Sequence, residues 1–355
     1  MTTLRFSLLL LILGSFTLPN TATAQWVSSE FIYVEAPFAS CHASTLVETE
    51  RGILAAWFGG TAEGRDDVEI WTSQLTDGNW SAPKRVADGV QEDGKRFPCW
   101  NPVLFQLEER LLLFYKVGPS PREWWGMVKE STDAGESWSE ARRLPEGILG
   151  PIKNKPILLS NGRLLCGSSS EHGGWRLHME WSDDQGKTWE RTEALNPSDS
   201  MQSIQPTLLR LPNDRIQALC RAKNEGRITT TTTDDGGNTW SEVTTLALPN
   251  NNSGIDAVTL SDGRHVLIYN HLSRGRSKLH MAISKDAKNW EAVMILEDEP
   301  RSEFSYPAII QTKDGKIHVT YTWKRERVKH VVVDPDDLET QPILGGEWPL
   351  NTPDF

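Results

Sequence analysis

Short apolar or alternating segments recur along the chain and are separated by residues that favour turns. The clearest segments are six to eight residues long and span 110–116, 163–168, 215–221, 265–270 and 316–323. Several of them follow a turn pair, such as Asn161-Gly162 or Asp314-Gly315, and such pairs favour tight hairpins. No long segment has the 3.6-residue apolar period of an amphipathic helix. The pattern therefore predicts an all-β protein made of short strands joined by hairpins.

A motif of the form Ser/Thr-x-Asp-x-Gly-x-x-Trp recurs between these segments. Full copies span 131–138, 182–189 and 233–240, and degenerate copies span 72–80 and 284–290. We expect the Asp carboxylate to accept hydrogen bonds from backbone N–H groups of a tight turn, and the Gly to supply a positive φ. We expect the closing Trp to pack between neighbouring sheets. The motif is therefore interpreted as a structural element of the fold.

The spacing of the motif predicts a repeat architecture. The closing Trp residues fall at intervals of 58, 51, 51 and 50 residues, and a unit of this length with four short strands is typical of a β-propeller blade. Five motif copies and a final unit at 305–334 predict six blades. A strand at 31–36 is expected to complete the last blade and close the ring. Residues 25–355 are therefore predicted to form a single six-bladed β-propeller.

The first 24 residues have the features of a secretory signal peptide. One Arg precedes an apolar run at 6–13, and Ala22-Thr23-Ala24 provides the small residues of a cleavage site. A retained membrane anchor is the alternative, but the run is too short to span a bilayer comfortably. We therefore expect a secreted or periplasmic protein with no membrane span after cleavage of residues 1–24.

The composition narrows the range of partners. The formal net charge of −11 argues against a general nucleic-acid-binding protein, which needs a net basic face, but it allows a local basic pocket for an acidic ligand. No His, Asp or Glu cluster has the spacing of metal ligands, so we predict no metal and no other cofactor.

The four cysteines also lack the spacing of a zinc site. Cys166 and Cys220 lie in apolar strands, where buried free thiols are expected. Export would permit a disulfide between Cys41 and Cys99, and the sequence leaves this pairing open.

The repeated motif is the Asp-box, and five copies in one chain resemble the sialidase (neuraminidase) superfamily. The resemblance covers nearly the whole chain after the signal peptide. It implies a glycosidase with an arginine triad for the sugar carboxylate, a Tyr nucleophile with a Glu partner, and an Asp acid/base. Tyr306 resembles the nucleophile, because the segment 304–317 keeps the family's distance from Tyr to Asp-Gly. A phenol attacks the anomeric carbon beside a carboxylate with less charge repulsion than a carboxylate would.

Two arginines also match the family pattern. Arg221 ends the strand at 216–221, and Arg276 precedes the fourth Asp-box in an Arg-x-x-Leu sequence, with Arg274 as a close alternative. A guanidinium binds a carboxylate in a planar, bidentate manner. His42 stands where the family has its first arginine. A histidine binds a carboxylate when it is protonated, and it also serves as an acid or base near neutral pH.

The acid/base is expected in the loop before the second strand of the first blade. Counting back from that strand selects Glu63, with Asp66 as second choice, whereas Asp67 is expected to cap the strand. The strand that opens with Gln202 and Gln205 offers amides where the family has the Glu partner of its tyrosine, and Gln205 is predicted to contact the substrate. Other predicted ligand contacts are Trp100, Asn101 and His172. The charged run that contains Arg325 is expected to be solvated, with a ligand contact as the alternative.

These assignments predict a secreted sialidase-like exo-glycosidase that hydrolyses a terminal, acidic sugar from a glycan. Tyr306, Glu63 and His42 would form the reacting set, while Arg221 and Arg276 would bind the anion. Two alternatives stay open, because a propeller fold supports many functions. One is a uronate-polysaccharide lyase in which His42 or His172 is the base and Tyr306 the acid. The other is a non-catalytic glycan-binding propeller, which the missing Arg and Glu favour.

Overall fold

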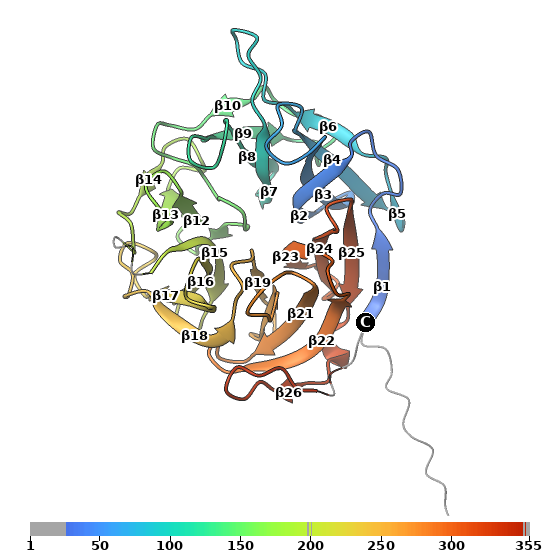
Figure 1. Ribbon diagram of the computed structural model, residues 1–355. Helices are drawn as coiled ribbons and strands as arrows, with labels where there is room; N and C mark the ends of the chain where they lie inside the picture. Colours follow the sequence, from blue (N-terminus) through green and yellow to red (C-terminus); the bar gives the residue numbers. More distant parts are fainter. Residues whose placement is uncertain (1–25, 197–198, 200, 351, 353–355) are drawn as a thin grey trace, which may run out of the picture.

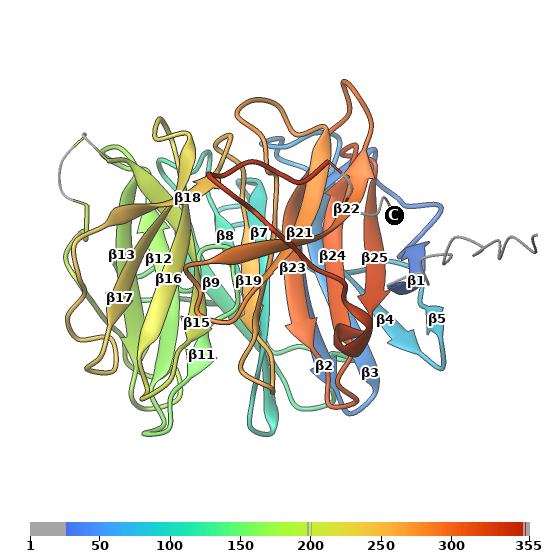
Figure 2. The same cartoon turned by 90° about the horizontal axis from the view of Figure 1, so that it is seen from below.

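Six antiparallel sheets surround a central axis, and each sheet forms one blade of a propeller (Figure 1). The computed structural model describes residues 26–196, 199, 201–350 and 352. Within these residues the regular elements are β-strands and one short 3-10 helix, Pro335–Asp337. Seen from the edge in Figure 2, the long strands run across the thickness of the disc. The prediction of an all-β, six-bladed propeller is confirmed.

The first three blades follow one another along the chain. Blade 1 contains β2 (Ser40–Thr49), β3 (Gly52–Gly60), β4 (Glu69–Thr76), β5 (Asn79–Trp80) and β6 (Lys84–Ala87). Blade 2 contains β7 (Cys99–Leu107), β8 (Arg110–Val117), β9 (Trp125–Ser131) and β10 (Arg142–Arg143). Blade 3 contains β11 (Ile157–Leu158), β12 (Leu164–Ser170), β13 (Arg176–Ser182) and β14 (Glu190–Arg191). The first strands of blades 1 and 2, β2 and β7, lie nearest the axis (Figure 1).

The last three blades include both ends of the described chain. Blade 4 contains β15 (Ser203–Arg210), β16 (Ile216–Ala222), β17 (Arg227–Thr233) and β18 (Thr244–Pro249). Blade 5 contains β19 (Asp256–Thr259), β20 (His265–Tyr269), β21 (Lys278–Ser284), β22 (Trp290–Asp298) and β26 (Gln341–Pro342). Blade 6 contains β23 (Phe304–Gln311), β24 (Ile317–Trp323), β25 (Arg327–Val333) and β1 (Trp26–Phe31).

The N-terminal strand completes the last blade. β1 pairs antiparallel with β25, with Glu30 opposite His330. The ring therefore closes as predicted, but the closing strand lies earlier in the chain than 31–36, so the predicted bounds are wrong. Beyond β1, Tyr33 stacks on Trp57 of blade 1 with ring centroids 5.1 Å apart. This aromatic contact draws the chain from blade 6 onto blade 1.

The Asp-boxes close the turns between the third and fourth strands of their blades. In the box of blade 3, Asp184 Oδ1 accepts hydrogen bonds from the backbone N–H of Lys187 at 3.1 Å and of Thr188 at 2.8 Å. These donors, with the Thr188 hydroxyl, lower the pKa of Asp184 to about 2. Gly186 has a φ of 88°. The predicted turn chemistry is confirmed.

The closing Trp of a box joins neighbouring blades. The Trp189 indole donates to Gly186 O at 3.1 Å, and its ring meets the edge of Phe114 in blade 2 at 5.9 Å. The boxes of blades 2 and 4 have the same backbone bonds to Asp133 and Asp235. The core accordingly lies between adjacent sheets, and strands such as β16 and β20 are buried along their whole length.

The four cysteines are buried free thiols. This agrees with the prediction for Cys166 and Cys220. It also answers the question that the sequence left open, because Cys41 and Cys99 form no disulfide in this structure.

The structure describes no helix that is long and apolar enough to cross a membrane between residues 26 and 352, outside the gaps given above. The predicted signal peptide, residues 1–24, lies outside the described residues.

Candidate active site

The innermost strands of four blades carry a bulge at the same place, near the start of the strand. The residue at each bulge has a left-handed backbone conformation, with φ of 55° at Ala43, 26° at Asn101, 57° at Gln205 and 52° at Tyr306. The pairing between the innermost strand and the next strand of the blade shifts register around each of these residues. In three of the four, a proline follows, which lacks the N–H that a regular ladder needs. Such bulges redirect side chains, and conformations of this kind cluster at functional sites.

The Tyr306 hydroxyl lies at the centre of the candidate site. Arg221 Nη1 donates to it at 2.6 Å, and Gln205 Nε2 donates at 3.3 Å. Gln205 Oε1 accepts from the same Arg221 nitrogen at 3.2 Å. Both residues that bond the phenol oxygen in the described part of the chain are therefore donors, whereas the family resemblance implied a carboxylate partner.

Arg221 is held in place by two neighbouring loops. Its Nη2 donates to the backbone oxygen of Asn252 at 2.7 Å and to Oδ1 of the same residue at 2.6 Å. The guanidinium also lies over the Trp175 ring, 4.8 Å from its centroid. Arg221 is consequently pre-organised, with little side-chain freedom left to lose when a ligand binds.

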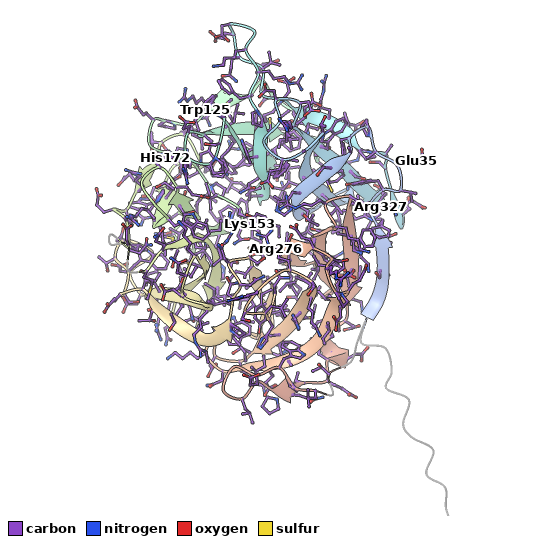
Figure 3. The ribbon with its side chains drawn as sticks, in the orientation of Figure 1. Glu35, Trp125, Lys153, His172, Arg276 and Arg327 are labelled. Carbon is purple, nitrogen blue, oxygen red and sulfur yellow. The ribbon has the colours of Figure 1, made fainter. Side chains whose placement is uncertain are left out.

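Further cations surround the tyrosine ring. The guanidinium of Arg276 and the Lys153 ammonium each lie 5.7 Å from the ring centroid of Tyr306, and Arg221 lies 5.6 Å from it. Figure 3 places Lys153 and Arg276 close to the axis. The structure therefore brings together Tyr306, Gln205 and both arginines that the sequence predicted, in a cluster of cationic side chains near the axis of an acidic protein (hereafter the pocket).

Lys153 is a buried part of this pocket that sequence reasoning did not assign. Its Nζ donates to Asn154 Oδ1 at 2.8 Å, to Ile255 O at 3.0 Å and to Pro307 O. Burial lowers its pKa to about 7, although the charge of Asp256 opposes this shift. These bonds connect blades 3, 5 and 6 beneath the tyrosine.

His42 packs directly against the nucleophile candidate. Its ring is 4.0 Å from that of Tyr306, and its Nδ1 lies 2.9 Å from Thr322 Oγ1. Burial lowers the pKa of His42 well below 6.5, and the charges of Arg325, Arg276, Arg221 and Lys153 lower it further. His42 is therefore neutral at physiological pH, and it adds no positive charge to the site.

The third guanidinium comes from blade 6, at the hairpin between β24 and β25. Arg325 Nε donates to Glu303 Oε1 at 2.8 Å, and its Nη1 donates to Glu63 Oε2 at 2.6 Å. Its carbonyl accepts from the backbone N–H of Cys41 at 2.8 Å, directly beside His42. The expectation that Arg325 is solvated is wrong, because ion pairs to two carboxylates hold its side chain over the pocket.

Glu303 forms ion pairs with two of the three arginines, Arg276 and Arg325. Its Oε1 accepts from Arg276 at 2.9 Å, from Arg325 at 2.8 Å and from the Ser305 hydroxyl at 2.8 Å. Burial alone would raise the pKa of Glu303, but the two guanidinium charges and the Ser305 hydrogen bond produce a net lowering. No motif in the sequence marks Glu303, and the sequence distinguishes Arg325 only as part of a charged run.

The two acid candidates lie on an exposed loop at 61–67. Glu63 pairs with Arg325, whereas Asp66 is exposed to solvent. Asp67 Oδ2 accepts from the backbone N–H of Thr61 at 3.0 Å, so this residue closes the base of the loop rather than capping the strand. A Cβ added at Gly64 would lie 3.4 Å from the Trp100 ring, which places the loop against that side chain.

Three predicted ligand contacts have other roles in this structure. Trp100 donates to Gly118 O at 2.9 Å and is almost fully buried, and Asn101 donates to Ile152 O at 3.2 Å. Both therefore pack the wall of the site. His172 is exposed in the loop between β12 and β13, away from the axis (Figure 3). Trp175, from the same loop, is the residue whose ring lies against the Arg221 guanidinium.

Among the residues that the structure describes, no group of three His, Cys, Asp or Glu side chains is arranged to hold a metal ion.

A six-bladed propeller with Asp-boxes and a cationic pocket around an axial tyrosine has the architecture of the sialidase superfamily. The sequence profile of the BNR repeat-like domain family matches residues 51–319. The chain belongs to this family.

Similar proteins support the same classification. An anhydrosialidase from Macrobdella decora is 24% identical over 234 residues, which are 57% of this chain and 30% of that protein. The intramolecular trans-sialidase from Ruminococcus gnavus has 16% identity and a TM-score of 0.71, over 90% of this chain and 100% of that one. The NanB sialidase from Streptococcus pneumoniae has 15% identity and a TM-score of 0.71, over 89% and 71%. At these identities, the solved structures establish the shared fold.

Proposed function

We propose that this protein is an exported glycoside hydrolase that removes a terminal, carboxylate-bearing sugar from a glycan. The observation that carries the proposal is the Tyr306 hydroxyl, 2.6 Å from Arg221 Nη1 within a group of further cations. Guanidinium groups favour a carboxylate by charge and by bidentate geometry. A sugar acid bound there would present its anomeric carbon to the phenol oxygen.

Each residue of the pocket then has a chemical role. The Tyr306 hydroxyl gives its proton to water as its oxygen attacks the anomeric carbon. The C–O bond to the leaving group breaks as Glu63, protonated from solvent beforehand, gives its proton to the leaving oxygen, with Asp66 as the second candidate acid. Arg221 and Gln205 stabilise charge that develops on the phenol oxygen. Water then hydrolyses the glycosyl-tyrosine. The sialidase names of the relatives support an acidic sugar of the sialic acid type, and the signal-like residues 1–24 support export.

A second candidate function is β-elimination of a uronate glycan. The observation that favours it is His42, which is neutral and packs 4.0 Å from the Tyr306 ring. A neutral imidazole would accept the proton next to the sugar carboxylate, while the arginines neutralise that carboxylate. The electron pair would form a C=C bond as the C–O bond to the leaving group breaks, and Tyr306 would protonate the leaving oxygen.

One experiment separates these functions. The mature protein and its Tyr306→Phe variant are incubated with sialosides and with uronate-containing oligosaccharides, and products are identified by mass. The Tyr33→Phe variant is the matched control, because it removes a phenol oxygen outside the pocket. Release of an intact acidic sugar by wild type and the control supports hydrolysis. An unsaturated, ultraviolet-absorbing product supports elimination. Binding without any product would refute both and support a glycan-binding propeller.

A further inference from the structure

Arg325 connects the acid-bearing loop to the wall of the pocket. One edge of its guanidinium is fixed, because Nε donates to Glu303, which also binds Arg276 and Ser305. The opposite edge, through Nη1, donates to Glu63 on the loop at 61–67. The Arg325 side chain therefore joins the firmly held carboxylate of Glu303 to the carboxylate of Glu63 on the loop.

The contact with Glu63 is the more easily exchanged of the two. The Glu63 side chain is 42% exposed, against 31% for Glu303. Among the residues that the structure describes, Arg325 is the one hydrogen-bond donor to the Glu63 carboxylate. Glu303, in contrast, is held by three groups and lies beside a backbone bridge to Arg276. A competing carboxylate would displace Glu63 and leave Glu303 in place.

The hairpin that carries Arg325 is held in an unfavourable backbone conformation. Lys324 and Arg325 have consecutive positive φ values of 54° and 63°. Hairpins that need this conformation normally use Asn or Gly, because the Cβ of other residues crowds the following carbonyl oxygen. The strained turn directs the guanidinium over the pocket, where its charge reaches His42.

We propose that Glu63 occupies, in the free protein, the place at Arg325 that the carboxylate of the substrate takes during catalysis. The incoming sugar acid displaces Glu63, and this exchange releases the loop so that Glu63 reaches the leaving oxygen. While Glu63 accepts from Arg325, its carboxylate is occupied and donates no proton. The inference rests on the proposed glycosidase function and adds a step in which the substrate's own charge assembles the acid.

The exchange has a consequence for specificity. A neutral sugar lacks the carboxylate that competes for Arg325, so it leaves Glu63 paired even when it occupies the pocket. Selectivity for acidic sugars therefore lies in kcat as well as in KM. Replacement of Arg325 by Met frees Glu63 for every substrate and removes one carboxylate contact at the same time.

The test uses N-acetylneuraminic acid and glucuronic acid as probes, with wild type, Arg325→Met and Lys324→Met. The last variant is the matched control, because Lys324 occupies the same turn and pairs with Glu299. Binding is measured by calorimetry, and hydrogen exchange of residues 61–67 is followed by mass spectrometry. In wild type and Lys324→Met, we expect binding to raise exchange in the loop. In Arg325→Met, exchange is already raised without ligand, and affinity falls about 10-fold to 100-fold.

The kinetic arm compares 4-methylumbelliferyl glycosides of N-acetylneuraminic acid, glucuronic acid and glucose. We expect Arg325→Met to lower the acidic-to-neutral ratio of kcat at least about tenfold, whereas Lys324→Met keeps it. Two results would refute the displacement of Glu63 and leave the glycosidase proposal standing. One is that ligand binding lowers hydrogen exchange in the loop at 61–67. The other is that Arg325→Met keeps wild-type affinity while Arg221→Met loses binding. Failure of wild type to bind either acid would overturn the proposed function and the exchange together.

Discussion

Acidification is expected to destabilise the propeller at its point of closure. His318 and His330 lie on neighbouring strands of blade 6, with His318 Nδ1 3.0 Å from His330 Nε2 and the rings stacked at 24°. Glu30 of the closing strand lies 3.3 Å from His330 Nδ1. The pKa of each imidazole is lowered to about 4, chiefly by burial. For His318 the charge of His330 contributes to this lowering, and the charge of Asp314 opposes it.

The sign of the effect follows from proton linkage. An unfolded histidine has a pKa of about 6.5, so the unfolded state binds more protons than the folded state between pH 6.5 and 4. Stability is therefore complete above pH 6.5 and is lost as the pH falls toward 4. Each histidine accounts for about 2 kcal/mol between pH 8 and pH 5. The pair together accounts for at most about 4 kcal/mol, a large fraction of the 5–15 kcal/mol of a typical domain.

The assay is urea unfolding at pH 7.5, 6.5, 5.5 and 5.0, followed by tryptophan fluorescence. His330→Gln keeps a polar side chain at the site but removes one titrating group. We expect its free energy of unfolding to fall less steeply with decreasing pH than that of wild type, by about 2 kcal/mol over this range. The acidic residues of the Asp-boxes do not interfere, because their lowered pKa values affect stability only below about pH 4. Equal pH slopes for both proteins would refute the reasoning.

Three further predictions concern the pocket. Tyr306→Phe should lower kcat about a thousandfold while the affinity for a free sugar acid, measured by calorimetry, changes less than about tenfold. Gln205→Glu should raise the rate of hydrolysis, measured as initial rates, because it places a proton acceptor 3.3 Å from the phenol oxygen; a fall in rate would contradict a role for Tyr306 as nucleophile. Gly254→Ala should lower kcat about tenfold, because the added Cβ would lie 3.3 Å from the Tyr306 ring. Thermal unfolding should show that the free energy of unfolding falls by about 1 kcal/mol or less. A much larger fall would mean that the mutation damages the fold instead.

The fold was accessible from the sequence because its determinants are local. An Asp-box is completed within eight residues, and its carboxylate finds donors three and four positions away. The positions of Tyr306, Arg221 and Arg276 could also be predicted, because Tyr306 and Arg221 lie in strands and Arg276 lies just before one, each at a fixed place in a blade. Ring closure was harder to place, because the bounds of β1 depend on pairing with a strand at the far end of the chain.

The ion pairs of Arg325 with Glu63 and Glu303 could not be predicted from the sequence in the same way. Arg325 and Glu63 are 262 positions apart, and their contact exists only because the ring brings blade 6 beside blade 1. The prediction that His172 contacts the ligand depended on a loop, whose conformation the sequence pattern does not determine. The place of His172 next to a blade strand suggested a pocket residue, but the conformation of a loop is decided by contacts such as that between Trp175 and Arg221.

The family resemblance predicts an arginine at the position of His42, and this prediction is best considered together with Arg325. A third arginine beside Arg221 and Arg276 would leave positive charge in the pocket unbalanced before a ligand binds, unless carboxylates compensate for it. Here Glu303 and Glu63 provide that compensation, and Arg325 reaches the pocket from a hairpin instead of from blade 1. The position in blade 1 is thereby free for a neutral imidazole in contact with Tyr306. The cationic cluster is therefore kept with a neutral imidazole beside the tyrosine, and for this reason we propose elimination as the alternative to hydrolysis.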